Sequence, residues 1–302
     1  MLKDNFGRVI TNLRISITNR CNLNCLYCHR EGETNPSKDI SADRIIEIAE
    51  AFHTLGVKKL KITGGEPLLR RDLFDILVEM PSFQEISMTT NGTFLSEKAY
   101  ELKECGLDRV NISLDTLDPD KYRYITGGGR IEKVLAGIET AYNAQLTPIK
   151  VNTVVMKGIN ETEIDELLAF TNLFNDKNIQ VILQLIELIP ITPMLRRYYY
   201  DISKLESKYA KIATGVNVRA MHKRRQYITP LGVVEIVKPI DNIEFCLNCN
   251  RIRVTSDGKL KLCLLGNKIV DINGLHGTAL IDTIKRAVKL REPFFPKMNN
   301  FI

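Results

Sequence analysis

The sequence predicts an α/β fold: an incomplete, TIM-like barrel of six strand–helix units, (β/α)6, followed by a small, irregular C-terminal domain. Between Leu13 and Leu188, strand-like runs alternate with helix-like segments of about 10 to 15 residues, which is typical of a parallel sheet. The crossovers in such a sheet are right-handed. Six units are two fewer than a closed eight-fold barrel has, so one side should stay open for a substrate or a second domain.

Boundary residues place each element of this barrel. Ser41 is a typical helix N-cap and Gly56 a typical C-terminal stop, so a helix should cover most of the residues between them. The expected strands are residues 13–18, 58–62, 85–89, 109–113, 150–155 and 179–188. The expected helices are residues 41–55, 72–80, 97–105, 131–143 and 161–175.

The pattern changes after about Pro190, which predicts a first domain at residues 1–190 and a second at residues 191–302. In the second domain, a hairpin is expected around Ser256–Lys259, where Ser-Asp-Gly-Lys separates two alternating runs. The run Tyr198–Tyr200 is interpreted as packing, because aromatic side chains serve cores first.

Composition narrows the class of protein. The chain has 302 residues, of which 44% are hydrophobic, and a net charge of +6, which is mild beside the dense basic stripes of nucleic-acid-binding proteins. We therefore expect no nucleic-acid partner, although the charge favours an acidic small molecule. The triplet at 223–225, Lys-Arg-Arg, is interpreted as a solvated surface turn. No run is apolar enough for a membrane span or signal peptide, so we expect a cytoplasmic protein without membrane association.

The seven cysteines form two groups of three, at 21, 25, 28 and at 246, 249, 263, with Cys105 alone at an expected helix end. Such clustering indicates metal binding in a reducing compartment rather than disulfides. Cys105 is given no role. The four histidines, at 29, 53, 222 and 276, are interpreted as surface or packing residues.

Cys21, Cys25 and Cys28 follow the first expected strand with x3 and x2 spacing. A four-iron cluster is normally held by four cysteines, so three would leave one iron open for a ligand that is not protein. The alternative is a zinc site with His29 as the fourth ligand. Zinc cysteines are usually separated by two residues, so the x3 gap favours the cluster.

Short segments rich in polar residues and glycine follow the other expected strands as well. They are Gly64-Gly65-Glu66-Pro67, Thr89-Thr90-Asn91-Gly92, Asn111-Ile112-Ser113-Leu114-Asp115 and Met156-Lys157-Gly158. In parallel barrels the carboxyl ends of the strands form the active-site face, so these segments should share one site with the cysteines.

The motif from Cys21 to Cys28 resembles that of the radical S-adenosylmethionine enzymes, which have a six-unit barrel. The resemblance implies that the open iron chelates the methionine part of S-adenosylmethionine and that the reduced cluster cleaves it to a 5′-deoxyadenosyl radical. It also implies cofactor contacts, each weighed against a purely structural role, at Tyr27, Gly65, Glu66, Ser113 and Ile189.

Cys246, Cys249 and Cys263 again supply three ligands, with x2 and x13 spacing. A second open cluster is favoured over a zinc ribbon that lacks a ligand, because no histidine lies in the interval. Between these cysteines, Arg251 and Arg253 alternate on an expected strand and should face the same side.

The two arginines could be solvated on an edge strand, or they could clamp a phosphate. Further cations are expected on the inner side of the barrel, at Arg14, Lys59, Lys61 and Lys150. Unpaired inward cations need an anion, and a triphosphate would meet that need.

From Leu13 to Leu265 the chain is similar to the GTP 3′,8-cyclase family, lyases that begin molybdenum cofactor biosynthesis. The segments that carry the similarity are 13–16, 62–68, 89–92, 111–115, 151–160 and 245–264. The resemblance implies conversion of GTP to (8S)-3′,8-cyclo-7,8-dihydroguanosine 5′-triphosphate with two 4Fe-4S clusters and S-adenosylmethionine. It implies GTP contacts at Arg14, Lys61, Thr89, Lys150, Arg251 and Arg253, with the guanine base at the second cluster. Arg251 and Arg253 are also expected to be catalytic, together with the three cysteines of the first group.

The implied partners are an external one-electron reductant and a downstream cyclic pyranopterin monophosphate synthase. A homodimer is a further expected assembly.

Three departures from the family pattern are expected to matter. Gln184 stands where the family often has an arginine, and Ile189 stands where it commonly has a methionine. The segment Met298–Ile302 lacks the paired glycines of many family members. The rival hypotheses are a radical peptide maturase, which generally needs more cysteines, and a non-catalytic iron–sulfur sensor.

Overall fold

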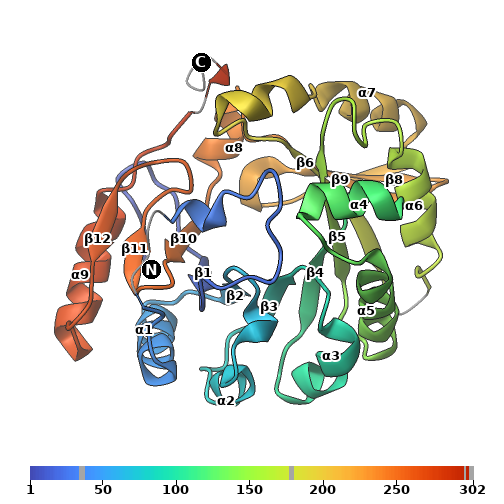
Figure 1. The fold of residues 1–302 in the computed structure, drawn as a ribbon. Coiled ribbons are helices and arrows are strands. Elements are labelled where there is room, and N and C mark those ends of the chain that lie inside the picture. Colours follow the sequence, from blue (N-terminus) through green and yellow to red (C-terminus); the bar gives the residue numbers. More distant parts are fainter. Residues whose placement is uncertain (34–37, 177–179, 296, 299–302) are drawn as a thin grey trace.

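The computed structural model describes residues 1–33, 38–176, 180–295 and 297–298. Its strands form a single curled sheet. Six strands pair in parallel and in sequence order, and Figure 1 shows them as an open arc. They are β1 (Asn12–Ser16), β2 (Lys59–Thr63), β3 (Glu85–Thr90), β4 (Arg109–Ser113), β5 (Ile149–Val155) and β6 (Val181–Glu187). The predicted six-unit barrel is confirmed, although the first residue expected in the sixth strand, 179, lies outside the described part.

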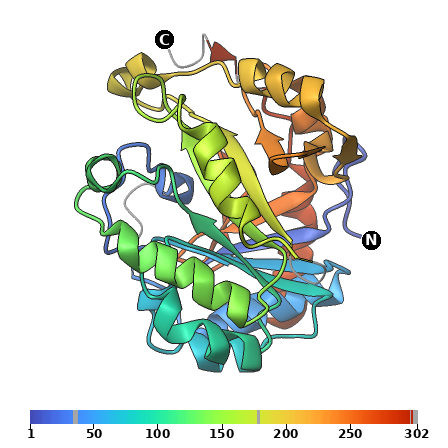
Figure 2. The same ribbon diagram turned by 90° about the vertical axis from the view of Figure 1, so that its right-hand side faces the viewer.

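Helices cover the outer side of this sheet (Figures 1 and 2). They are α1 (Ala42–Thr54), α2 (Leu73–Val78), α3 (Leu95–Glu104), α5 (Ile131–Asn143) and α6 (Ile164–Asn172). Ser41 caps α1 by accepting from the backbone of Arg44, and Gly56 follows the helix with a φ of 84°, as predicted. An additional helix that was not expected, α4 (Pro119–Thr126), is capped by Asp118. No helix in the described part of the chain is long and apolar enough to cross a membrane.

The C-terminal residues extend the sheet at both edges. β9 (Gly232–Val237) pairs in parallel with β6 and continues into β8 (Arg225–Thr229) and β7 (Gly215–Val218). β10 (Arg251–Val254) pairs in parallel with β1 and continues into β11 (Lys259–Lys261) and β12 (Ile269–Asp271). Three further helices are α7 (Ser203–Ile212), α8 (Ile243–Leu247) and α9 (Gly277–Lys289). The predicted hairpin at 256–259 is confirmed, and the division near residue 190 stays a prediction because the sheet is continuous across it.

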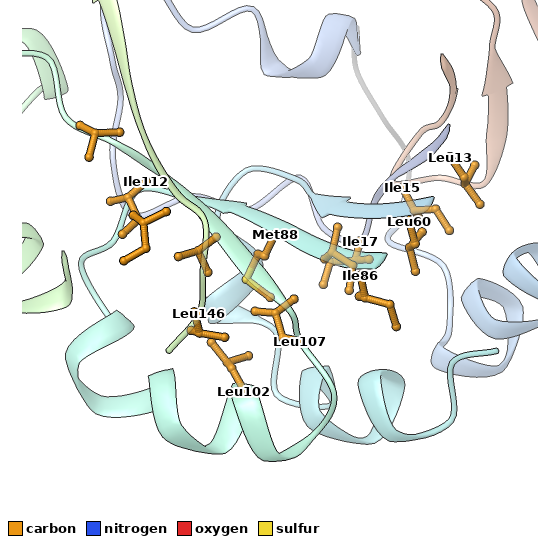
Figure 3. Close-up of a cluster of buried hydrophobic side chains, with 14 of the residues drawn as sticks. Leu13, Ile15, Ile17, Leu60, Ile86, Met88, Leu102, Leu107, Ile112 and Leu146 are labelled. Atoms are coloured by element: carbon orange, nitrogen blue, oxygen red, sulfur yellow. The ribbon is translucent and has the colours of Figure 1, made fainter. Parts of the chain in front are cut away.

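The main hydrophobic core fixes which side chains face inward. Leu13 and Ile15 of β1 are fully buried in this core, part of which Figure 3 shows between the strands and the helix that carries Leu102. Because successive side chains of a strand point to opposite faces, Arg14 must face the inner side. The same alternation turns Lys61 inward. Burial of the apolar residues thus positions the cations.

Candidate functional site

A cavity of about 840 Å³ lies at the inner face of the curled sheet. Its described wall contains twelve arginine or lysine residues against four glutamates, so it favours an anionic ligand. The cavity brings together the predicted GTP contacts Arg14, Lys61, Thr89, Lys150, Arg251 and Arg253, the second cysteine group, and Tyr27, Ser113 and Ile189. Cys21, Cys25, Cys28, Gly65 and Glu66 belong to loops outside its described wall.

The first cysteine group lies in the loop between β1 and α1. Cys21 and Cys28 are exposed and Cys25 is partly buried. Burial raises the pKa of Cys25, and the nearby Asp115 and the other two thiols raise it further, which places the three sulfur atoms in one neighbourhood. Among the described residues, no three potential ligands come close enough for a single metal ion. A four-iron cluster binds each cysteine through a different iron and tolerates wider spacing, so the residues fit a cluster better than zinc.

The Gly-Gly-Glu-Pro loop supports this cysteine loop through its backbone. The N–H of Gly65 donates to the carbonyl of Thr18 at 2.7 Å, and the N–H of Glu66 donates to the carbonyl of Arg20 at 2.8 Å. The Glu66 carboxylate is buried and accepts from Thr90 Oγ1 at 2.8 Å and from the backbone of Asn91 at 2.7 Å. Burial raises the pKa of Glu66 to about 7. Its predicted cofactor contact stays a prediction, and the geometry favours a structural role.

Gly65→Ala should abolish the cleavage of S-adenosylmethionine that the resemblance implies. A Cβ at Gly65 would lie 2.3 Å from the carbonyl oxygen of Arg20, and this backbone leads directly to Cys21. Formation of 5′-deoxyadenosine and bound iron should both fall. Gly215→Ala is the matched control, because its Cβ would make an ordinary contact, 3.5 Å from Ile228. Normal cleavage by Gly65→Ala would contradict the tight packing of the two loops.

Tyr27 is oriented by Asp115, which the sequence placed at the shared site without assigning it a role. Its hydroxyl donates to Asp115 Oδ2 at 2.6 Å, while Asp115 Oδ1 accepts from the backbone of Val154 at 2.8 Å. Burial raises the pKa of Asp115 to about 6. It lies two residues after Ser113, just beyond the end of β4. Asp115 therefore connects two barrel strands to the predicted cofactor contact.

The second cysteine group is supported by both ends of the chain. Arg291 Nη2 lies 3.5 Å from Cys249 Sγ, and Arg8 Nη1 donates to the carbonyl of Cys246 at 3.0 Å. Asp4 is bound to both arginines, at 2.7 Å from Arg8 and 2.9 Å from Arg291. Burial raises the pKa of Cys246, and the neighbouring thiols of the group raise it further, so these sulfur atoms also share one neighbourhood. The donor set again fits an iron–sulfur cluster.

The expectation that the inward cations are unpaired is wrong for several of them. Arg14 Nη1 lies 2.9 Å from Glu31, Arg253 Nε lies 3.7 Å from Glu31, and Lys150 Nζ lies 2.5 Å from Glu235. These carboxylates were missed because they belong to the segment that follows the first cysteine group and to β9, and no sequence pattern connects these segments with the cations.

Lys61 and Arg251 differ from these paired cations. Lys61 Nζ donates to Asn111 Oδ1 at 2.9 Å, and Arg251 Nη2 contacts Met221 Sδ at 3.1 Å. Neither forms an ion pair with a carboxylate in the described part of the chain. Among the predicted GTP contacts, they are therefore the cations most available to an anion in the cavity.

The interpretation of 223–225 as a solvated turn is wrong for Arg224. Its side chain is only 11% exposed, lines the cavity and lies 2.7 Å from Glu235. Gln184, which stands where an arginine is common, donates to the same carboxylate at 3.3 Å. Although burial alone would raise it, Arg224 and Lys150 lower the pKa of Glu235 to about 2. Arg224, which directly precedes β8, thus brings an arginine to the same carboxylate that Gln184 contacts.

Two histidines also border the cavity, which sequence reasoning did not anticipate. His222 is buried and stacks on Phe245 with ring centroids 3.8 Å apart. His29 lies beside Glu31, and burial lowers its pKa. The ring contact of His222 fits the packing role expected of it, whereas Nδ1 of His29 is buried without a hydrogen-bond partner among the described residues.

Glu235→Ala should reduce the free energy of unfolding by roughly 3–5 kcal/mol, because it leaves Lys150 and Arg224 buried without their carboxylate. Since its folded pKa is depressed, the stabilisation by Glu235 is present above pH 4.5 and is lost as the pH falls toward 2. Denaturant unfolding measures both effects. Glu132→Ala is the control, because the Arg130–Glu132 pair is exposed and should contribute under about 1 kcal/mol. Equal losses in both variants would contradict the assigned network.

Comparisons with known proteins show the family of the chain. The model of the radical SAM superfamily matches residues 15–171, and that of the Molybdenum Cofactor Synthesis C family matches residues 181–295. A probable GTP 3′,8-cyclase of Archaeoglobus fulgidus is 61% identical over 98% of this chain and 99% of its own length. The chain belongs to the GTP 3′,8-cyclase family of the radical SAM superfamily.

Other members of the family are also similar along the whole chain. Probable GTP 3′,8-cyclases of Methanosarcina mazei and Pyrococcus abyssi are 48% and 44% identical over 98% of this chain, and 90% and 100% of their own lengths are covered. Among solved structures, SuiB of Streptococcus suis bound to the precursor peptide SuiA has a TM-score of 0.67 at 17% identity, covering 94% of this chain and 67% of that one. The structure of anSMEcpe with bound AdoMet has a TM-score of 0.57 at 16% identity, covering 91% and 80%. At such identities the likeness supports the fold alone.

Proposed function

We propose that this protein converts GTP to (8S)-3′,8-cyclo-7,8-dihydroguanosine 5′-triphosphate, the first step of molybdenum cofactor biosynthesis. The observation that carries the proposal is the single cavity in which inward cations of β1, β2, β5 and β10 meet the second cysteine group. A triphosphate satisfies the cations, and a base at the other end of the nucleotide reaches the cysteines. Membership in the family supports the same substrate.

Two groups of cysteines have the residue types that would bind the two iron–sulfur clusters. Cys21, Cys25 and Cys28 would hold the first 4Fe-4S cluster, with S-adenosylmethionine beside Gly65, Tyr27, Ser113 and Ile189. A second 4Fe-4S cluster would be held by Cys246, Cys249 and Cys263. When bound, the first cluster and S-adenosylmethionine supply the one-electron chemistry that removes a hydrogen atom from the ribose.

The chain itself binds and orients the substrate. Thr89 Oγ1 is buried without a hydrogen-bond partner in the described structure, and the residue lines the cavity, so its hydroxyl is available to a ligand. Lys61 and Arg251 offer charge without a competing carboxylate. Arg14, Lys150 and Arg253 complete the wall. Such fixed donors hold the nucleotide in one position, and the protein contributes orientation while the cofactor carries the reaction.

The proposal also includes the partners, the location and the assembly of the enzyme. An external one-electron reductant must supply electrons, and a separate cyclic pyranopterin monophosphate synthase would use the product. We place the enzyme in the cytoplasm, where such a reductant and GTP are available, and we include a homodimer among the proposed assemblies.

The test compares nucleotides after anaerobic reconstitution with iron and sulfide, in the presence of reductant and S-adenosylmethionine. GTP should stimulate formation of 5′-deoxyadenosine strongly, whereas ATP, CTP and UTP should not. Equal formation with all four nucleotides, or none with GTP, would contradict the proposed substrate.

A further inference from the structure

Glu31 places a carboxylate in the middle of the cationic wall. It belongs to the short helix η1 (Arg30–Gly32), which follows the first cysteine group, and it lines the cavity. Its side chain is 13% exposed and accepts from Arg14 Nη1 at 2.9 Å and from Thr63 Oγ1 at 3.2 Å. Arg253 Nε lies 3.7 Å away. Arg14 and Arg253 are two of the cations assigned to the triphosphate.

The two arginines keep unused hydrogen-bonding capacity in this arrangement. Arg14 Nε and Arg253 Nε are both buried without a hydrogen-bond partner among the described residues. The contact of Arg253 with Glu31 is an ion pair that is too long for a hydrogen bond. A phosphate group has more acceptor oxygens and more charge than a carboxylate, so it can satisfy both guanidinium groups better than Glu31 does.

The backbone that carries Glu31 is unfavourable. Arg30 has a φ of 46° and Glu31 a φ of 53°, so two consecutive residues other than glycine adopt the left-handed region. Such residues persist only where surrounding contacts hold them. The contacts here include those of the carboxylate with the two arginines and with Thr63, and the backbone hydrogen bonds of η1. Once an anion replaces the contacts with the arginines, the loop can leave this conformation.

We propose that Glu31 competes with a phosphate: its carboxylate contacts Arg14 and Arg253 when no polyphosphate is bound, and it is displaced when one binds. Two anions cannot share this pair without strong repulsion, so the ligand must overcome the contacts of Glu31. Glu31 therefore sets the affinity of the anion site. The identification of the anion as the triphosphate of GTP rests on the proposed function.

The test is the dissociation constant of inorganic triphosphate, measured calorimetrically at fixed ionic strength with anaerobically purified protein, without S-adenosylmethionine or reductant. Glu31→Gln should bind triphosphate about tenfold more tightly than the wild type, because the competing charge is gone. Glu85→Gln is the matched control. Glu85 also lines the cavity and pairs with two cations, Lys59 at 2.9 Å and Arg109 at 2.6 Å, but not with the arginines in question. It should change the constant less than about twofold.

The outcomes separate the two hypotheses. Weaker binding by Glu31→Gln would mean that Glu31 stays in place and positions the arginines, which overturns the proposal while the triphosphate site stands. Equal gains in Glu31→Gln and Glu85→Gln would reveal a general effect of charge and would also overturn it. If the wild type and both variants fail to bind triphosphate, the triphosphate site of the proposed function is wrong as well. Circular dichroism of each variant checks that it is folded.

Discussion

Cys249→Ser should lower GTP turnover by at least about 10³-fold while S-adenosylmethionine still binds as in the wild type. Cys249 borders the cavity as part of the second cysteine group, whereas Cys21, Cys25 and Cys28, which are expected to hold the cluster that binds S-adenosylmethionine, lie outside the described wall of that cavity. Loss of one thiolate should prevent assembly of the second cluster and leave the nucleotide base without its partner. Bound iron should fall from about eight to about four atoms per chain.

Cys105→Ser is the matched control for this variant. Cys105 is the lone cysteine, at the C-terminal end of α3, and it packs against the hydrophobic core away from the cavity wall. Its substitution should leave iron content and turnover unchanged. Normal cyclisation of GTP by Cys249→Ser would show that the second group has been misassigned.

Lys61→Met should weaken GTP binding by roughly 100-fold, because it removes a cation that has no carboxylate partner in the described structure. The residue also predicts a pH dependence. Burial of its amino group, together with the nearby Arg109 and Arg14, lowers the pKa of Lys61 well below its ordinary value. A bound triphosphate would raise this pKa again. Binding should therefore take up a proton, and affinity should fall as the pH rises from the pKa of the empty site toward that of the complex.

Calorimetry in two buffers of different ionisation enthalpy measures this proton uptake. Lys59→Met is the control on the same strand, because Lys59 is paired with Glu85 at 2.9 Å and its side chain is 41% exposed. It should retain the proton uptake and most of the affinity. Identical proton uptake by the wild type and Lys61→Met would contradict the assigned role of Lys61.

The inward cations could be predicted because strand alternation is local. Leu13 and Ile15 must reach the core, so Arg14 must face the cavity, and Ile252 places Arg251 and Arg253 in the same way. The polar loops after each strand were predictable for a similar reason, since the carboxyl ends of parallel strands meet.

The partners of these cations could not be predicted, because they depend on pairings between distant segments. Glu235 reaches Lys150 only because β9 joins the sheet beside β6, and Arg224 is buried only because β8 folds back on β9. Asp4 and Arg291 meet near Cys249 from opposite ends of the chain. No spacing or periodicity in the sequence carries these contacts.

The central claim is that one cavity presents the ribose of GTP to the radical generated from S-adenosylmethionine. The most direct test uses GTP that carries deuterium at C3′, with reconstituted wild-type enzyme under anaerobic conditions. Mass spectrometry should find the deuterium in 5′-deoxyadenosine, together with a cyclised triphosphate. Unlabelled 5′-deoxyadenosine, with the deuterium retained in the nucleotide, would contradict the account.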